Sequence, residues 1–578
     1  MLPQGRSDSR DARTLRAAAR MPNQTASARV APAGNSPNGL LSIGIVLEAH
    51  VVPAWAAELL GDLQRDERIV LRFVLLAPAR PPETARGRGL RDRAVYAVFK
   101  LYEGADRLLF GRGWRLSEHT DLRRHLPGVP IVSEEKSRDD AGRVAEPLDM
   151  LFTLGFVYVP APLAESARYG VWSLECGGAE YAAINLALFW TVYAGSPTFS
   201  ITLRASTPTH THVLYTSQTA ATPISLHRNR QVATRKGAYY VSQRLREVQE
   251  RGLAAVAASN LGAAAFPSAD WPTPSPLQTI VCVGKIARRV LTRQNDRRMH
   301  RERWFIAYRR LPAGEEPGQA FDGFQVLTPP PGHSFMDPFL YCSEGARYIF
   351  FEDFEDRAGQ AVISYVEIDE DGRASEPRVA LRRPYHVSYP CVFEWNGDIY
   401  MVPETTANRT IELYRSDAFP DRWILDRVLA RDVLAADSTV FVQGGRLWLL
   451  TSLATPGTVV DDELCVFSAD SLDGEWVEHP MNPVVADHAR ARPAGYIFSR
   501  NGDLIRPAQD GRHRYGSAVV FNRIERLSET EYREVPIRRF DGGSIAKNIG
   551  THTYSFDGTF EAVDGRWLHP KLRPPRRR

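Results

Sequence analysis

The second half of the chain contains a repeat that restricts its possible folds more than any other feature. Residues 337–352 align without gaps with residues 389–404, which begin 52 positions later, and related stretches begin at Asp437 and Ala494. Each consists of an apolar segment, a glycine turn and a second apolar segment. A repeat of about 50 residues with about four strands per unit is typical of propeller blades, which leave few exposed edges because they close into a ring.

A fifth unit is predicted from the two ends of this region. Residues 551–556 and 562–567 have the same strand character, and residues 304–308 supply another short apolar strand. We therefore expect an all-β five-bladed propeller over residues 301–570.

The first half has a different pattern. Residues 41–47 and 69–76 are continuous apolar runs typical of buried strands, and residues 50–64 between them have helical spacing. Further strands are expected at 148–154 and 170–174, and helices at 92–102 and 181–193. Strands that alternate with helices indicate an α/β domain of Rossmann type with a parallel or mixed sheet, which we place at residues 40–225.

Three other segments complete the expected organisation. Residues 1–39 are rich in Arg, Ala, Ser and Pro without periodicity, which predicts a disordered tail. Residues 226–300 are interpreted as a helical connector with a proline-rich linker at 263–276. Residues 571–578 form a basic tail.

Composition excludes several classes of function. The 72 basic and 68 acidic residues are dispersed, which argues against a nucleic-acid partner. No run of about 18 apolar residues predicts an integral membrane segment, and without a secretory signal we expect a cytoplasmic protein. The five cysteines form no CxxC pair, so no structural zinc is expected.

Carboxylates recur at equivalent positions of the repeat. The first position holds Asp337 and Asp437 in two of the units, and the end of the second strand holds Glu352 and Glu404. Two or three carboxylates that meet in one pocket are what glycoside chemistry needs, since one protonates the leaving oxygen while another activates water or attacks the sugar. The alternative is that these carboxylates cap blade turns.

We predict that Asp337, Glu404 and Asp437 are catalytic. Glu404 follows an apolar strand, where burial would raise its pKa, so it is the expected proton donor, whereas Asp337 is expected to stay ionised as base or nucleophile. No metal ligand set is expected. The predicted substrate-binding residues are His333, His386, Tyr389, Arg492, Arg506, Gln509, Asp510 and His552.

Several motifs in this half, spread over residues 300–570, support a family resemblance. They are 333–339 (HSFMDPF), 386–390 (HVSYP), 403–404 (PE), 419–423 (FPxxW), 474–483 (GxWxxHPxNP), 492–495 (RPAG), 506–510 (RPAQD) and 550–553 (GTHT). The region resembles the propeller domain found N-terminal in plant glucosamine inositolphosphorylceramide transferases and in bacterial relatives. That domain is similar in fold to five-bladed glycosidases of the arabinanase type. The resemblance implies a glycan or glycolipid partner, although the plant proteins transfer sugar with a separate domain not expected here.

The first half resembles, more weakly, the formyltransferase fold that binds formyl-tetrahydrofolate. Residues 170–177 occupy the stretch that carries the Asn-x-His element of that family, with Ser173 in place of the Asn and Glu175 in place of the His. The later element with an Asp becomes residues 208–214, which hold His210 and His212 but no Asp. The resemblance therefore implies a domain that has lost its original chemistry.

Three functions stay open on the sequence. The first is a carbohydrate-active protein of polysaccharide or glycolipid metabolism whose propeller acts on or binds a glycan, without a cofactor. The second is a formyl or acyl transferase to an amino sugar, which would use formyl-tetrahydrofolate in the first domain. The third is a non-catalytic scaffold in polysaccharide assembly.

Overall fold

A computed structural model describes residues 40–77, 90–111, 119–133, 148–154, 159–180, 183–260, 271–319, 322–455, 459–543 and 545–571. These residues form two compact units. One holds residues up to Arg293 together with Thr455, and the other holds the rest of the chain from Gln294 onward. The expected tail at 1–39 and almost all of the one at 571–578 lie outside the described residues, as does most of the expected linker at 263–276.

The first unit is built on a mixed eight-stranded sheet in the order β10-β9-β7-β6-β1-β3-β5, with β8 paired to β7. Strands β1, β3, β5, β6 and β7 are parallel, whereas β9 and β10 run antiparallel to their neighbours. The strands are β1 (Leu41–Leu47), β3 (Ile69–Leu76), β5 (Ile131–Ser133), β6 (Met150–Leu154), β7 (Val171–Cys176), β8 (Ala179–Glu180), β9 (Thr198–Ser206) and β10 (Thr211–Ala220). A ribbon of β2 (Val51–Pro53) and β4 (His119–Asp121) lies outside this sheet. The expected α/β class is confirmed, and the formyltransferase resemblance stays a prediction.

Helices connect these strands, as parallel neighbours require. They are α1 (Ala54–Arg65), α2 (Leu90–Phe110), α4 (Ala161–Ser166), α5 (Ile184–Ala194), α6 (Leu226–Arg251), α7 (Leu253–Ala258) and α8 (Pro276–Met299), with a 3₁₀ turn at Leu122–Arg124. Helix α6 buries Leu226, Tyr240 and Leu245 and packs against α1, α2 and α5. The stretch interpreted as a connector, 226–300, therefore consists mainly of helices that belong to this unit. No helix within the described ranges is long and apolar enough to cross a membrane.

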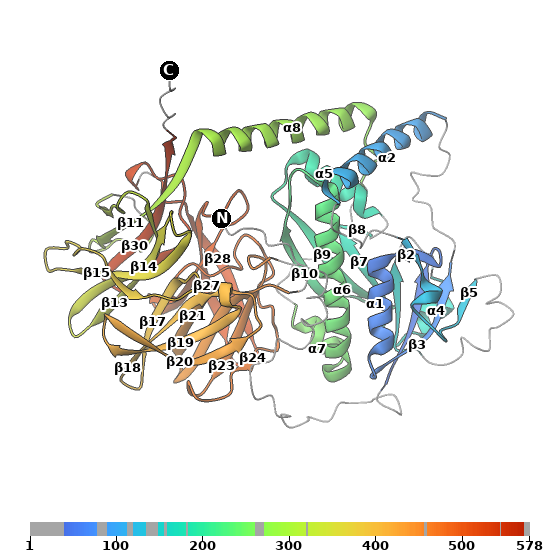
Figure 1. The fold of residues 1–578 in the computed structure, drawn as a ribbon. Helices are drawn as coiled ribbons and strands as arrows, with labels where there is room; N and C mark the ends of the chain where they lie inside the picture. Colours follow the sequence, from blue (N-terminus) through green and yellow to red (C-terminus); the bar gives the residue numbers. More distant parts are fainter. Residues whose placement is uncertain are drawn as a thin grey trace, which may run out of the picture. The chain divides into compact units, whose positions relative to one another are not determined.

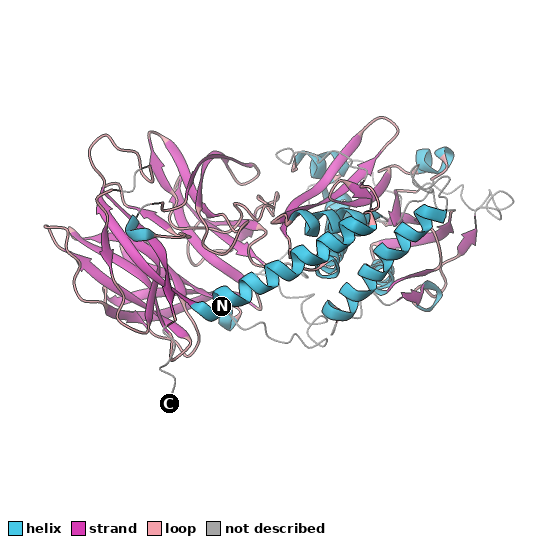
Figure 2. Ribbon diagram, turned by 90° about the horizontal axis from the view of Figure 1, so that it is seen from above, coloured by secondary structure: helices cyan, strands magenta, loops and turns pink. Residues whose placement is uncertain are grey.

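The second unit consists of five four-stranded antiparallel sheets, and Figure 2 shows that strands make up almost all of its regular structure. Short 3₁₀ turns occur at Thr406–Asn408 and Ile545–Lys547. Four blades follow one another along the chain (Figure 1). They are β13 (His333–Ser343), β14 (Ala346–Glu355), β15 (Gln360–Ile368) and β16 (Arg378–Leu381); β17 (Ser388–Trp395), β18 (Asp398–Thr405), β19 (Thr410–Ala418) and β20 (Arg422–Arg431); β21 (Ala435–Gln443), β22 (Arg446–Leu453), β23 (Leu464–Ala469) and β24 (Val477–Glu478); and β25 (Phe498–Arg500), β26 (Asp503–Gln509), β27 (Val519–Leu527) and β28 (Tyr532–Phe540).

The fifth blade closes the ring with strands from both ends of the unit. It joins β11 (His300–Arg310) and β12 (Gln325–Leu327) to β29 (Tyr554–Phe556) and β30 (Phe560–Pro570). Strands β11 and β30 pair along their whole length, from His300 opposite Pro570 to Arg310 opposite Phe560. The predicted five-bladed propeller is confirmed.

Gly495 marks a point where two blades approach closely. Its φ is +125°, and a Cβ atom there would lie 1.9 Å from the carbonyl oxygen of Tyr554 in the fifth blade. The amide of Gly495 also donates to the hydroxyl of Tyr389 at 2.6 Å. Only glycine fits this contact without moving backbone, so the position is a sensitive test of blade packing.

Gly495→Ala should lower the free energy of unfolding by about 3 kcal/mol, because it adds both backbone strain and a clash with backbone. Gly397→Ala is the matched control, since its φ is +87° but no atom lies within 4 Å of the added methyl group. That control should cost only about 1 kcal/mol. Denaturant unfolding of both variants measures the difference, and equal losses would contradict the packing described.

Candidate functional site

Three blades place a residue in an unusual backbone conformation at the same position of the repeat. Asp337, Tyr389 and Asp437 have φ values of 52°, 48° and 53°, in the left-handed region. Each lies at a register shift in the first strand of its blade. Such conformations are rare in residues other than glycine and cluster at functional sites. The bulges let residues of different blades meet, since the amide of Tyr389 donates to Asp337 Oδ2 at 3.3 Å.

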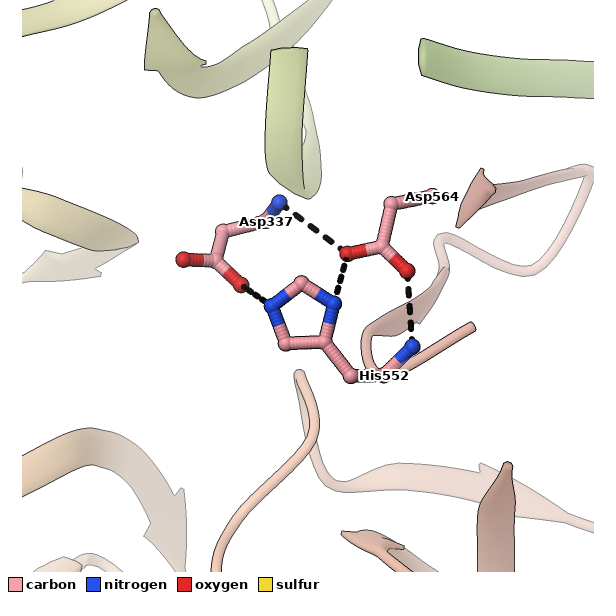
Figure 3. Close-up of side chains that lie close together, drawn as sticks. All are labelled: Asp337, His552 and Asp564. Atoms are coloured by element: carbon pink, nitrogen blue, oxygen red, sulfur yellow. Dashed lines mark hydrogen bonds and ion pairs between the residues drawn. The ribbon is translucent and has the colours of Figure 1, made fainter. Parts of the chain in front are cut away.

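Asp337 is joined to the fifth blade through an imidazole ring (Figure 3). His552 Nε2 lies 3.2 Å from Asp337 Oδ1, and His552 Nδ1 lies 2.6 Å from Asp564 Oδ2. Burial alone would lower the pKa of His552, but the charges of Asp564 and Asp337 outweigh it and raise the pKa to about 10. Burial likewise opposes ionisation of Asp337, yet His552 and Thr553 outweigh it and lower the Asp337 pKa. The cluster therefore contains an imidazolium between two carboxylates.

These three side chains also have the donor atoms of a metal site. A metal would need a ring nitrogen with a free lone pair, because only neutral imidazole coordinates. The two nitrogens of His552 face different carboxylates, and a pKa of about 10 keeps both protonated at neutral pH. In this structure each ring nitrogen of His552 faces one carboxylate, an arrangement that fits a protonated histidine.

A second group of charges is arranged around Arg492. Its guanidinium contacts Asp437 Oδ2 at 2.5 Å and Asp461 Oδ1 at 2.8 Å, and it lies 3.6 Å from Glu404 Oε2. Gln509 Nε2 donates to the same Asp437 oxygen at 2.6 Å. The structure thus brings together four predicted residues, Glu404, Asp437, Arg492 and Gln509, from three blades.

Two glutamates in this region have strongly raised pKa values. Burial is the largest cause for Glu404, followed by the charge of Asp437, and Arg492 only partly opposes them. Burial also raises the pKa of Glu352, followed by the charge of Asp337. The surroundings therefore favour the protonated form of both glutamates and the ionised form of Asp337. Titratable groups whose pKa values are pushed apart in this way are typical of acid/base pairs.

Three other predicted binding residues lie near the cluster and differ in their exposure and in their contacts. His386 Nε2 lies 3.4 Å from Glu352 Oε1, and burial lowers the pKa of this histidine. Tyr389 is fully buried, and its hydroxyl is bonded to Thr439 and Gly495. His333 is about a third exposed, and its Nδ1 lies 2.7 Å from Asp353. His386 contacts the acidic cluster through its ring, whereas Tyr389 does so through its backbone amide and His333 pairs with Asp353 instead.

Arg506 and Asp510 are not brought to the cluster. The Arg506 guanidinium is buried, bonded to both carboxylate oxygens of Glu534 at 2.7 Å and to a backbone carbonyl. Asp510 is bonded to Arg512 and Arg539, which outweigh the effect of burial and lower its pKa to about 2. Both residues have internal partners that account for their charge.

Four further residues complete the cluster without having been selected from the sequence. Glu352 carried a signal, because it is the repeat equivalent of the selected Glu404. Asp564 precedes a glycine and so has the pattern of a turn, but it lies inside β30. Asp461 and Tyr515 lie in loops and carried no pattern; the Tyr515 ring lies 4.8 Å from that of His552.

In the first unit, the residues that replace the formyltransferase motif do not form a new site. Glu175 Oε2 is paired with Arg204 Nε at 2.8 Å, while His210 is exposed and bonded to Thr209. Strand β7 pairs Glu175 with Thr202, whereas His212 is opposite Ala205, three residues further along β9. Burial raises the pKa of the Cys176 thiol, which makes it a poor nucleophile.

Comparison with solved structures gives weak overall likeness. The family 117 glycoside hydrolase Zg3597 of Zobellia galactanivorans aligns with a TM-score of 0.31 and 14% identity, over 47% of this chain and 93% of its own. A GH43_1 enzyme from Xanthomonas citri aligns with a TM-score of 0.30 and 13% identity, over 42% of this chain and 88% of its own.

Sequence comparison identifies the propeller more specifically. Residues 328–551 match the family model described as glucosamine inositolphosphorylceramide transferase 1, N-terminal. The predicted resemblance is confirmed. Proteins of that name from Oryza sativa subsp. japonica and Arabidopsis thaliana are each 35% identical over 211 residues, which is 36% of this chain. The match spans only 28% of the length of these curated relatives.

His552→Gln should remove a pH-dependent part of the stability. The folded pKa of about 10 lies above the ordinary histidine pKa of about 6.5, so the imidazolium stabilises the fold fully below about pH 6.5, and this contribution is lost as the pH rises through about 10. The variant should therefore be much less stable than the parent at pH 6 and closer to it at pH 10. Denaturant midpoints at both values test this, and a gap that stays constant would contradict a charged His552.

The first unit should not formylate amino sugars with formyl-tetrahydrofolate. The Glu175 carboxylate is paired with Arg204, and no histidine within the described ranges contacts it, so the general base that amine attack requires is not assembled. A chromatographic assay for formylated amino sugar measures this. Folate-dependent product that disappears in Glu175→Ala would contradict the prediction.

Proposed function

We propose that the propeller is a carbohydrate-active domain whose charged cluster acts on a glycan or on the glycan part of a glycolipid. The observation that carries the proposal is the meeting of buried carboxylates from neighbouring blades, with Asp337 held by His552 and Glu404 beside Asp437 and Arg492; these surroundings shift the pKa values of Glu404 and Asp337 in opposite directions. The match to a domain named after a transfer onto inositolphosphorylceramide supports a glycolipid context.

Glycoside cleavage gives each group a role. Glu404 is the proton donor, because burial and the charge of Asp437 raise its pKa and so favour the protonated carboxyl. Asp337 is the base or nucleophile. Its Oδ1 is bound to Thr553 and His552, whereas Oδ2 accepts a hydrogen bond from the Tyr389 amide and points away from the imidazole in Figure 3. That oxygen retains a lone pair for a water molecule or a sugar carbon.

The remaining polar groups bind and orient. Arg492 and Gln509 fix Asp437 through short hydrogen bonds, and Asp437 in turn raises the Glu404 pKa. The backbone amide of Asp437 also donates to Glu404 Oε2 at 3.2 Å, which leaves Oε1 to carry the proton. Cytoplasmic residence and the identity of the sugar stay predictions.

Glu404→Gln should lower turnover of a glycoside by about 10²-fold or more, the usual contribution of a general acid. The loss should be smallest for aryl glycosides with acidic leaving groups, which need little protonation. Glu394→Gln, an exposed glutamate of the same blade, is the matched control and should keep full activity.

Turnover is measured on a panel of nitrophenyl glycosides and on glycosylated inositol phosphates. Equal losses on good and poor leaving groups would assign Glu404 to binding instead of proton transfer. Saturable glycan binding without turnover by the parent protein would replace the proposed chemistry with the scaffold alternative.

A further inference from the structure

The first unit contains a cavity of about 440 Å³ that the propeller site does not involve. Its walls come from α2, α5 and the first turns of α6, with Trp55 at the start of α1. Helix α6 packs against both α2 and α5 (Figure 1). The volume lies within the range of small-molecule sites, about 300–1,000 Å³.

The topology places this cavity at the edge of the sheet where ligands usually bind. Strands β1, β6 and β7 are parallel, and β10 runs in the same direction as β7 because two antiparallel pairings relate them. Helices α1, α5 and α6 begin after β1, β7 and β10 respectively, beyond a short strand in the first two cases. All three therefore start at the carboxyl ends of the strands, the edge outside which open α/β sheets hold their ligands.

The cavity lining is positively charged. Lys100, Arg107 and Arg230 contribute three cations, and Glu103 contributes one carboxylate. Lys100 pairs with Glu103 at 2.7 Å, while neither arginine has an ion pair with any residue in the described ranges. The net formal charge of about +2 matches that of a phosphate monoester, about −1.5 to −2 at neutral pH.

The pKa of a buried histidine in the cavity lining, His227, is lowered, in part by these cations. His227 lines the cavity and is 1% exposed. Burial, then the charges of Arg230 and Arg107, lower its pKa to about 4, so the ring is neutral. Arg230 Nη2 lies 3.2 Å from His227 Nδ1, so the neutral ring accepts a hydrogen bond from this arginine without neutralising its charge.

The site does not depend on the helix N-terminus. The second amide of α6, that of His227, donates to Asp106 Oδ2 at 2.7 Å, and the Ser225 hydroxyl donates to the same oxygen at 3.1 Å. An anion in the cavity would therefore be held by the arginine side chains. Their planar donors suit two phosphate oxygens at once.

One acceptor in the lining is left without a donor. Glu103 Oε1 is buried and has no hydrogen-bond partner, whereas Oε2 accepts from Lys100. A buried acceptor without a partner costs free energy, which a hydroxyl group of a ligand would recover. A ligand that matched this lining would place a hydroxyl group against Glu103 Oε1 and an anionic group against Arg107 and Arg230.

We propose that this cavity binds a small hydroxylated phosphate monoester. Arg107 and Arg230 bind the phosphate, Asn185 orients Arg230 through a contact of 3.4 Å, and Glu103 accepts a hydrogen bond from a ligand hydroxyl. The site is separate from the propeller cluster and does not rest on the function proposed for it.

Calorimetric titration of the full chain with glycerol 3-phosphate and with inorganic phosphate tests the proposal. Arg107→Ala and Arg230→Ala should each weaken binding of both probes by about tenfold or more, the effect of one charged hydrogen bond. Arg228→Ala is the matched control, because this exposed arginine of α6 lies over the Phe110 ring and does not line the cavity. It should bind as the parent does.

Glu103→Gln separates the two halves of the site. It should reduce the preference for glycerol 3-phosphate over inorganic phosphate without weakening phosphate itself, because the amide is a poorer acceptor. Arg107 is exposed, so its variant should fold normally, and the thermal midpoint without ligand checks this.

Binding to lipid vesicles distinguishes a lipid headgroup from a soluble phosphate monoester as the ligand. Sedimentation with phosphatidylcholine vesicles that contain phosphatidic acid, lost in Arg107→Ala, would identify a lipid headgroup, whereas binding of glycerol 3-phosphate alone would identify a soluble ligand. Failure to bind any of these probes, or equal binding by the parent and both arginine variants, would overturn the proposal.

Discussion

The propeller site depends on one buried cation, the imidazolium of His552. It lies between Asp337 of the first blade and Asp564 of the fifth, so the charge that keeps Asp337 ionised also bridges the point where the ring closes. A buried charge without a partner is costly, and removal of one member of a buried ion group is strongly destabilising. The ion pairs of His552 therefore both set the charge of the site and join the first blade to the fifth.

In the second half of the cluster, the buried cation that lies among carboxylates is the guanidinium of Arg492. Arg492 contacts Asp437, Asp461 and Glu404, but its Glu404 contact is the longest. Arg492 lies closer to Asp437 than to Glu404, and the negative charge of Asp437 raises the pKa of Glu404. A shorter contact with Arg492 would lower the Glu404 pKa further, so the longer contact is what lets burial and Asp437 raise it.

Both units bring together polar groups that are far apart in the sequence. In the propeller, bulges with positive φ lie inside the first strands and let Asp337 and Asp437 meet neighbouring blades. In the α/β unit, the last turn of α2 and the first turns of α6 bring Arg107 and Arg230 to one cavity. The chain therefore combines an acid/base cluster in one unit with a cationic cavity in the other.

The sequence by itself determined the architecture and part of the site. A gapless repeat predicts blades because each blade must bury its faces against the next, and alternation of apolar strands and helices predicts the parallel sheet in the same way. Ring equivalence also pointed to Asp337, Glu404 and Asp437; the structure joins Asp337 to Tyr389 and Glu404 to Asp437 across blades, and the catalytic role of these carboxylates stays a prediction.

Tertiary structure decided the rest. Arg506 and Gln509 lie on the same strand, but side chains alternate between its faces, so Gln509 reaches Asp437 whereas Arg506 meets Glu534 inside the blade. Asp564 precedes a glycine, a local pattern typical of a turn, but the structure places it inside strand β30. The cationic cavity joins residues more than a hundred positions apart, and no local pattern records which arginines of an arginine-rich chain will lack a carboxylate partner.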